Sequence, residues 1–289
     1  MKKRIPISKS YIYISVFAVV SLSMLLPMLS IAQNPRNLVA YWRFNGDYDD
    51  ATGNGHDGRK KGNVKFVKSK APVPDAGQAV QFARQAGNAV EIRNSDGLRL
   101  TDELSLMAWV NPDDAAPTQF CCGVPYDAGG NWDNPWVGHQ IGVRGHKMAT
   151  WLTLDGKAPA PGGRQGAGPD GDDADWEYDA GQVIAGEWNH IAFIFTGSAA
   201  ISYVNGDEVA NHRDRKGKIG FDGKPIFVIG ERSVSAPGEP FGGLIDEVAL
   251  FDVALTRTQL RNFMNNSIKL SVAPGGKSTT TWGTIKSRY

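Results

Sequence analysis

The sequence predicts an all-β protein built as a two-sheet antiparallel sandwich. Short runs in which apolar and polar residues alternate recur along the chain, and this period of two is typical of half-buried strands. Turns rich in glycine and proline separate the runs, and the 289 residues include 34 Gly and 16 Pro. Strands do not alternate with helical segments, which argues against a parallel α/β sheet.

The expected strands can be placed from this alternation. In the first strand we expect Leu38, Ala40, Trp42 and Phe44 to share one face, opposite Arg43. A strand at 104–110 has the same pattern, with its apolar residues on one face. Further strands are expected at 89–92, 141–143, 148–154, 190–195, 200–204, 208–210, 225–230 and 244–251.

Three connecting segments can also be interpreted. Asn205-Gly206 predicts a tight hairpin, because a type I′ turn needs two residues with positive φ. Residues 256–264 predict one short helix, with Thr256 as its N-cap and Gln259 completing a capping box. Residues 155–181 are polar and rich in glycine and proline, so we expect a long loop there. After the helix, 268–289 predicts a two-stranded tail hairpin.

The N-terminal segment predicts export. Basic residues precede an apolar run over 11–29, and Ser30-Ile31-Ala32 then offers a cleavage site, which is the pattern of a signal peptide over 1–32. The run reaches the roughly 18 residues of a membrane-span candidate, so an uncleaved anchor is the alternative. After removal of the signal no segment is long enough to span a membrane. We expect an extracellular, periplasmic or cell-surface location.

The charge distribution gives no sign of a nucleic-acid partner. Loss of residues 1–32 removes four of the 31 Lys and Arg and none of the 30 Asp and Glu, so the mature chain carries a net charge of −3. Nucleic acid binding needs a clustered basic face. The densest basic run, Lys60, Lys61, Lys65, Lys68 and Lys70, is interpreted as solvated lysines that protect edge strands from aggregation.

The two cysteines, Cys121 and Cys122, are adjacent. They therefore cannot form a long-range disulfide within one chain. A vicinal disulfide, bonds to another chain and two free thiols all remain open, and for an exported protein we predict the vicinal ring. In a loop, such a ring would offer a flat apolar surface to a ligand. Zinc is disfavoured, because a second pair of ligands at suitable spacing is missing.

Four motifs occur in order along the chain: Y-W-x-F-N-G at 41–46, G-E-W-N-H at 186–190, Y-V-N-G at 203–206 and G-x-I-D-E-V at 243–248. With these motifs the chain resembles the laminin-G-like jelly roll of the concanavalin A-like lectin/glucanase superfamily, over about 38–265, and we assign 33–267 to this domain. The resemblance implies a jelly-roll sandwich whose first and last strands lie together.

The resemblance also implies a structural calcium ion where the first and last strands meet. Carried over to this chain, it nominates Asp246, then Asn45 and Asp47, with a main-chain carbonyl near Gly87. Calcium prefers several oxygen ligands of these kinds. The alternative is that Asp246 only forms hydrogen bonds to the N-terminal loop.

Catalysis is not expected. Glucanases on this fold carry an E-x-D-x-E type strand, and the nearest match, Glu177-Tyr178-Asp179, lacks the third carboxylate. Asp246 and Glu247 are neighbours on a predicted strand, so their side chains should point to opposite faces. The runner-up is nevertheless a glycoside hydrolase. His190 is expected to be a structural histidine with satisfied hydrogen bonds.

The expected function is that of a non-catalytic binding or adhesion module. Tyr126, Trp132, Trp136 and Trp176 fall in predicted loops, where burial in the core does not explain them. Aromatic rings stack on sugar rings, and loops on a rigid scaffold commonly carry binding residues. These four residues predict a glycan site, and an extracellular protein is the other expected partner. Packing of these rings against the sandwich rim is the alternative.

Overall fold

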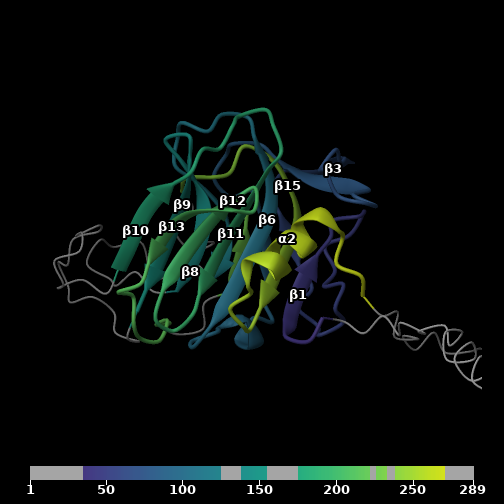
Figure 1. The fold of residues 1–289 in the computed structure, drawn as a ribbon. Coiled ribbons are helices and arrows are strands. Elements are labelled where there is room, and N and C mark those ends of the chain that lie inside the picture. The colour runs from purple at the N-terminus through teal and green to yellow at the C-terminus, as the bar shows by residue number, and fades with distance from the viewer. Residues whose placement is uncertain (1–34, 125–137, 155–174, 222–225, 233–237, 271–289) are drawn as a thin grey trace, which may run out of the picture. The chain divides into compact units, whose positions relative to one another are not determined.

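The computed structural model describes residues 35–124, 138–154, 175–221, 226–232 and 238–270. They form two antiparallel sheets packed face to face, which confirms the predicted all-β jelly-roll sandwich (Figure 1). The predicted signal peptide, 1–32, and residues 271–289 of the predicted tail hairpin lie outside the described residues. No helix within the described ranges is both long and apolar enough to cross a membrane.

The first sheet contains eight of the described strands and the second contains seven. In the first sheet the order is β13 (Asp207–His212), β12 (Ala200–Val204), β11 (Asn189–Phe195), β6 (Leu104–Pro112), β15 (Gly243–Phe251), β4 (Gln78–Phe82) and β3 (Val64–Lys68), and β1 (Leu38–Trp42) also pairs with β15. In the second it is β10 (Asp175–Ala180), β9 (Lys147–Thr153), β8 (His139–Arg144), β7 (Gln119–Val124), β14 (Phe227–Ile229), β5 (Ala89–Ile92) and β2 (Arg59–Lys61).

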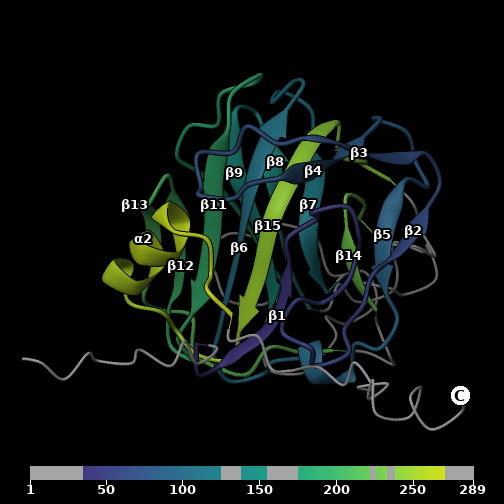
Figure 2. The ribbon, with the colours of Figure 1, turned by 90° about the vertical axis from the view of Figure 1, so that its right-hand side faces the viewer.

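The first and last strands lie side by side, as expected. β1 runs antiparallel to β15, with Trp42 opposite Val248, and Figure 2 shows the two strands together at the front of the first sheet. Trp42 is fully buried between the sheets, where its ring stacks on Phe227 of the second sheet at 5.0 Å. Its Nε1 donates a hydrogen bond to the carbonyl oxygen of His56 at 2.9 Å. Trp42 therefore joins the two layers.

The predicted faces of β1 are correct except at Leu38. Ala40, Trp42 and Phe44 enter the core between the sheets, whereas Leu38 packs with Tyr41 in a second cluster on the outer face of the first sheet. The pairing with β15 shifts register between Leu38 and Ala40. A bulge of this kind reverses the alternation locally.

The C-terminal helix covers that second cluster. α2 (Arg257–Asn265) begins at the N-cap Thr256, and the capping box with Gln259 is present, as predicted. Its Leu260 is fully buried in the cluster, against the outer face of the first sheet. The helix thus buries the apolar outer surface that this part of the sheet would otherwise expose.

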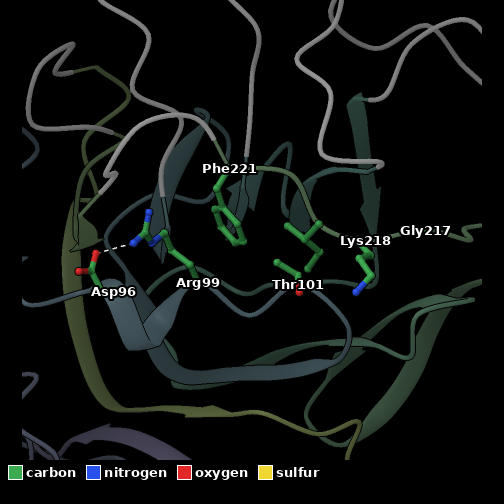
Figure 3. Close-up of a pocket in the computed structure, with 7 residues that line it drawn as sticks. Asp96, Arg99, Thr101, Gly217, Lys218 and Phe221 are labelled. Atoms are coloured by element: carbon green, nitrogen blue, oxygen red, sulfur yellow. Dashed lines mark hydrogen bonds and ion pairs between the residues drawn. The ribbon is translucent and has the colours of Figure 1, made fainter.

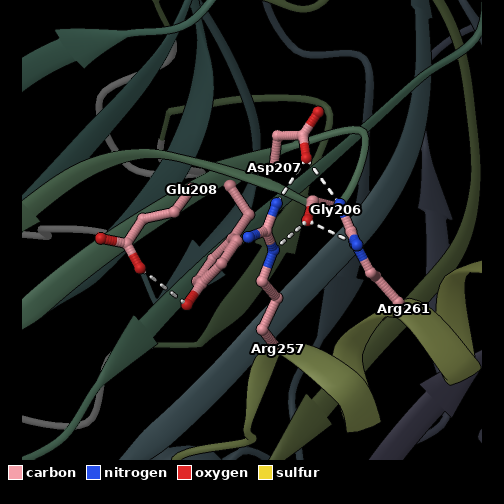
Figure 4. Close-up of polar contacts among 6 residues, drawn as sticks. Gly206, Asp207, Glu208, Arg257 and Arg261 are labelled. Atoms are coloured by element: carbon pink, nitrogen blue, oxygen red, sulfur yellow. Dashed lines mark hydrogen bonds and ion pairs between the residues drawn. The ribbon is translucent and has the colours of Figure 1, made fainter.

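The predicted hairpin at Asn205-Gly206 is also confirmed, with φ angles of 50° and 76°. Two arginines of α2 hold this turn (Figure 4). The carboxylate of Asp207 accepts a hydrogen bond of 2.6 Å from both Arg257 and Arg261. The carbonyl oxygen of Gly206 accepts a further bond from the Nε of each arginine.

The basic run lies at the edges of the sandwich. Lys60 and Lys61 belong to β2, at one end of the second sheet, and Lys65 and Lys68 belong to β3, at one end of the first. These positions support the interpretation that the lysines protect edge strands from aggregation, because charged lysines discourage pairing with a second molecule.

Part of the predicted 155–181 loop is a strand. β10 (Asp175–Ala180) pairs with β9 along six residues, from Asp175 opposite Thr153 to Ala180 opposite Met148. The polar composition of this segment did not predict a strand. An edge strand is stabilised by backbone pairing with its neighbour rather than by its own propensity. Residues 155–174 lie outside the described part of the chain.

Candidate functional site

A pocket of about 630 Å³ opens at one end of the sandwich (Figure 3). Among the described residues, two chain segments more than 100 residues apart line it. One is the short 3-10 helix η2 (Asp96–Leu98) with the residues after it, and the other leads from β13 towards β14. The lining residues are Asp96, Arg99, Thr101, Gly217, Lys218, Ile219 and Phe221.

Backbone hydrogen bonds fix the two segments against each other. The amide of buried Ile219 donates to the carbonyl oxygen of Thr101 at 2.8 Å, and Ile219 also forms an isolated antiparallel bridge with Leu154. The amide of Gly220 donates to the carbonyl oxygen of Thr153 at 3.1 Å. The pocket floor is therefore part of the rigid sandwich, although its residues lie in a connection between strands.

The pocket combines one aromatic ring with paired charges. Phe221 is half-buried and packs in a T-shaped arrangement against the ring of buried His139, with ring centres 6.1 Å apart. Arg99 forms an ion pair with Asp96. On the other side of Phe221 in Figure 3, Lys218 lies 2.8 Å from Asp102, and this contact lowers the pKa of the exposed Asp102 carboxyl.

These groups suit a polyhydroxylated ligand. An aromatic ring can carry the apolar C–H face of a sugar, while a guanidinium, an ammonium, a carboxylate and a hydroxyl group bind its hydroxyl groups. The volume lies within the range of small-ligand pockets, about 300–1,000 Å³. Exposed ion pairs contribute little to stability, so a ligand can replace them at small cost.

Three of the four predicted glycan-binding aromatics, Tyr126, Trp132 and Trp136, lie outside the described residues. Their segment joins the end of β7 to the start of β8, where Val124 pairs with His139. His139 is the residue that contacts Phe221 in the pocket wall. The two described ends of this segment thus lie next to the pocket.

The prediction that Trp176 lies in a loop is wrong. Trp176 belongs to β10, where its backbone pairs with Leu152 of β9. The regular ladder between the two strands fixes it within the second sheet. The side chain of Trp176 is not among the described parts of the structure.

The junction of the terminal strands contains a pair of buried carboxyl groups. Asp246 and Glu247 are 0% and 7% exposed. Glu247 has a positive φ of 51°, and the pairing of β15 with β6 shifts register between Asp246 and Ala249. This bulge explains how two neighbouring residues are both buried, and it removes the strict alternation that we assumed for them from the sequence.

Burial controls the ionisation of this pair. It raises the pKa of Asp246 to about 7, although hydrogen bonds from Ser69 and from the amide of Glu247, and the charge of Arg43, act in the opposite direction. Burial likewise raises the pKa of Glu247 to about 8. The cause is the loss of water around the charged form.

The described structure only partly assembles the predicted calcium ligands. Asp246 accepts hydrogen bonds from Ser69 Oγ at 2.6 Å and from the amide of Glu247 at 2.9 Å. Asn45 Oδ1 accepts from the amide of Gln78, the first residue of β4, and the preceding Gly77 accepts a hydrogen bond from the amide of Ser69. Asp246 and Asn45 therefore adjoin the same 69–78 segment.

Asp47 and Gly87 do not join them. Asp47 Oδ1 accepts from the amide of Asp49 within its own exposed loop. Gly87 lies beyond the far end of β4, because Phe82 pairs with Gly243 rather than with Asp246, and its amide donates to Glu231. In the described ranges no three His, Cys, Asp or Glu side chains form a group that could hold a metal ion. Calcium remains a prediction.

The cysteines lie in a strand, which corrects the expected loop. Cys121 and Cys122 are both fully buried in β7, where a bulge between Phe120 and Cys122 places them together in the core. They are free thiols whose sulfur atoms lie 2.9 Å apart, whereas a disulfide bond is about 2.05 Å long. The structure thus differs from the predicted vicinal ring, and burial excludes these sulfurs as a ligand surface.

Alkylation measures the state of these cysteines directly. Burial and the neighbouring thiol of Cys121 raise the pKa of Cys122 well above its ordinary value, so we expect no alkylation of the native protein at pH 7. Denaturation without reductant should then give an intact mass with two alkylated cysteines. An unmodified monomer lighter by two hydrogen atoms would show the ring instead, and a dimer sensitive to reductant would show bonds between chains.

The Glu177-Tyr178-Asp179 motif lies on β10, and of its three side chains the structure describes that of Asp179. Both carboxylate oxygens of Asp179 accept hydrogen bonds from Nε of Arg144, at 3.1 and 2.8 Å. The guanidinium of Arg144 also lies 5.7 Å from the ring centre of Trp151. Asp179 therefore belongs to an ion pair on the second sheet.

His139 and His190 are almost completely buried, at 1% and 2% exposed. Burial lowers the pKa of each to about 3, so both are neutral at pH 7. His190 packs against Trp109, which agrees with the structural role predicted for it, but its Nδ1 forms no hydrogen bond with the described residues. The expectation of a fully satisfied histidine is wrong in that respect.

Sequence comparison agrees with this architecture. A laminin-G-type family model, described as the concanavalin A-like lectin/glucanases superfamily, matches residues 84–261, which is more than half of the chain. The chain belongs to this superfamily. The match includes every described lining residue of the pocket and the G-x-I-D-E-V strand. No curated protein sequence matches the chain.

Solved structures of this superfamily's sandwich type are similar to the chain. Domain 4 of AbnA, an extracellular GH43 arabinanase of Geobacillus stearothermophilus solved with arabinotriose, has a TM-score of 0.55 at 22% identity. The similarity covers 79% of this chain and 98% of that domain. The binding domain of Paraclostridial Mosquitocidal Protein 1 has a TM-score of 0.57 at 11% identity, with 79% and 52% covered. The chain thus matches about half of that toxin domain. At these identities the similarity concerns the fold.

Proposed function

We propose that this protein is an exported, non-catalytic carbohydrate-binding module that binds a glycan in the pocket lined by Phe221, Arg99 and Lys218. The residues before Gln33 support export, because they have the pattern of a signal peptide. The fold supports a binding role, since a related domain was solved with arabinotriose. An extracellular protein is the other partner class that such a module can bind.

The observation that carries the proposal is the composition of the pocket. A half-buried aromatic ring stands between a guanidinium and an ammonium group, each close to a carboxylate. A sugar could stack on Phe221 while its hydroxyl groups take over hydrogen bonds from Arg99 and Asp96. Charged donors and acceptors form the stronger hydrogen bonds available to such a ligand.

The same pocket gives little support to a glycosidase. Hydrolysis of a glycosidic bond needs two carboxyl groups that flank it, about 5–10 Å apart. Among the described lining residues Asp96 is the single carboxylate, and Arg99 neutralises it. The binding role therefore accounts for the described pocket better than catalysis does.

Phe221→Ala and Arg99→Ala should each weaken glycan binding by about tenfold or more, because each removes a stacking or charged contact worth roughly 1.5–3 kcal/mol. The measurement is titration of the mature chain with oligosaccharides that bind in a glycan array containing arabinotriose. Folding should be nearly unchanged, because Phe221 and Arg99 are not fully buried.

Arg93→Ala is a matched control. Arg93 is an exposed arginine that is also paired with a carboxylate, Glu91 at 3.0 Å, but it does not line the pocket. The Arg93→Ala variant should bind glycan with the same affinity as the wild type. Trp132→Ala and Trp136→Ala, tested beside it, show whether the predicted aromatics contribute. Glycan binding that survives both pocket substitutions would refute the assignment of this pocket, and hydrolysis of a bound glycan would refute the non-catalytic role.

A further inference from the structure

The last strand changes its partner at the two buried carboxyl groups. β15 pairs with β4 over Gly243–Ile245 and with β1 from Val248 to Phe251. Asp246 and Glu247 lie between these two ladders. The positive φ of Glu247 shows that the backbone accepts a sparsely populated conformation there, which persists only where the surroundings enforce it.

Arg43 lies next to the point where β15 changes its partner. It is the first residue after β1, and its side chain is 32% exposed. Its Nε lies 3.8 Å from Glu247 Oε1, and its terminal nitrogen donates to the carbonyl oxygen of Asp75 at 3.4 Å. Its charge also acts on Asp246. One guanidinium therefore connects the end of β1, the 69–77 segment and β15.

When they are ionised, the buried carboxyl groups need such a cation. Glu247 Oε1 forms no hydrogen bond within the described residues, and a buried carboxylate without a counter-charge is strongly destabilising. Asp246 also relies on Ser69 and on the amide of Glu247. In the described part of the chain, the ion pair of Glu247 is formed with Arg43.

A calcium ion fits this junction poorly. Calcium takes about six to eight oxygen ligands. Here Asp47 is turned to its own loop, Gly87 belongs to another end of the sheet, and a guanidinium already lies beside the carboxyl groups. A second cation would repel Arg43 at short range.

We propose that Arg43 is the cation of the terminal-strand junction, and that its guanidinium holds the first and last strands together where the family resemblance predicted a calcium ion. The junction then depends on the protein's own side chain and is indifferent to divalent metal.

Thermal unfolding of the mature chain at pH 9, above the pKa of both carboxyl groups, tests this in two ways. The wild-type melting temperature should be the same in EDTA and in millimolar Ca²⁺. Arg43→Met keeps most of the apolar stem and removes the charge, so it should lower the melting temperature by about 5 °C or more.

A double-mutant cycle with Glu247→Gln separates pairing from packing. If Arg43 serves the carboxyl groups, Arg43→Met should cost clearly less in the Glu247→Gln background than in the wild type. If Arg43→Met does not fold, Arg43→Lys completes the cycle with the same expected sign. A fall of the wild-type melting temperature in EDTA would overturn the proposal, and so would strictly additive effects of the two substitutions.

Discussion

Raising the pH from 6.5 to 8 should lower the melting temperature of the protein by about 5 °C, from a loss of about 2 kcal/mol in the free energy of unfolding. Burial raises the pKa of Glu247 to about 8 and that of Asp246 to about 7. A carboxyl group with a raised pKa in the folded state stabilises fully below its unfolded pKa, and this stability is lost as the pH rises through the folded pKa.

His139 and His190 oppose this pH dependence of stability below pH 6.5. Burial lowers the pKa of His139 and His190 to about 3, while an unfolded histidine titrates near 6.5. Below pH 6.5 the unfolded state therefore binds more protons at these two residues, which offsets the gain from the carboxyl groups. The two effects nearly cancel, so we expect a level stability from about pH 5 to 6.5, with the fall towards pH 8 due to Glu247 and, in its lower part, to Asp246.

Glu247→Gln should flatten the profile between pH 6.5 and 8, measured by circular dichroism in EDTA. Asp102→Asn is the control, because Asp102 is exposed and its pKa is lowered, so its titration lies far below this window. A profile that is level or rising in the wild type would show that the two carboxyl groups are not buried as described.

Trp42→Ala should destabilise the protein by roughly 3–5 kcal/mol, the cost of removing a large buried aromatic side chain. The substitution removes the stack on Phe227 across the core and the hydrogen bond to the carbonyl oxygen of His56. It also opens a cavity beside β15, whose Val248 pairs with Trp42. Urea denaturation followed by circular dichroism gives the free energy of unfolding.

Trp42→Phe should cost less, because it keeps an apolar ring and loses mainly the hydrogen bond. Ile184→Ala is the control, since Ile184 is 45% exposed and should change stability little. Equal effects of the two Trp42 substitutions would assign the loss to the hydrogen bond rather than to packing.

The fold could be predicted because its signals are local. Alternation placed Leu104, Leu106, Ala108 and Val110 of β6 on one face, and all four enter the core between the sheets. The Asn205-Gly206 turn and the capping box of Thr256 depend on residues a few positions apart. Such features need no knowledge of distant contacts.

The candidate site could not be predicted in the same way. Arg99 and Phe221 lie in irregular connections without periodicity or motif, and a bridge between Leu154 and Ile219 and a bond between Ile219 and Thr101 bring their segments together. No local signal in the sequence identifies such a pair. The same holds for β10, which pairing with β9 forms despite its polar sequence.

The sequence by itself determined the β-sandwich and the capped helix, because alternation and turn chemistry act over short distances. The adjacency of the terminal strands was implied by the family resemblance. The tertiary structure alone decided which neighbouring residues share an environment. Bulges in β7 and β15 bury Cys121 with Cys122 and Asp246 with Glu247, where strict alternation would separate them. A bulge depends on the pairing of whole strands, and so does the position of Arg43 beside Glu247.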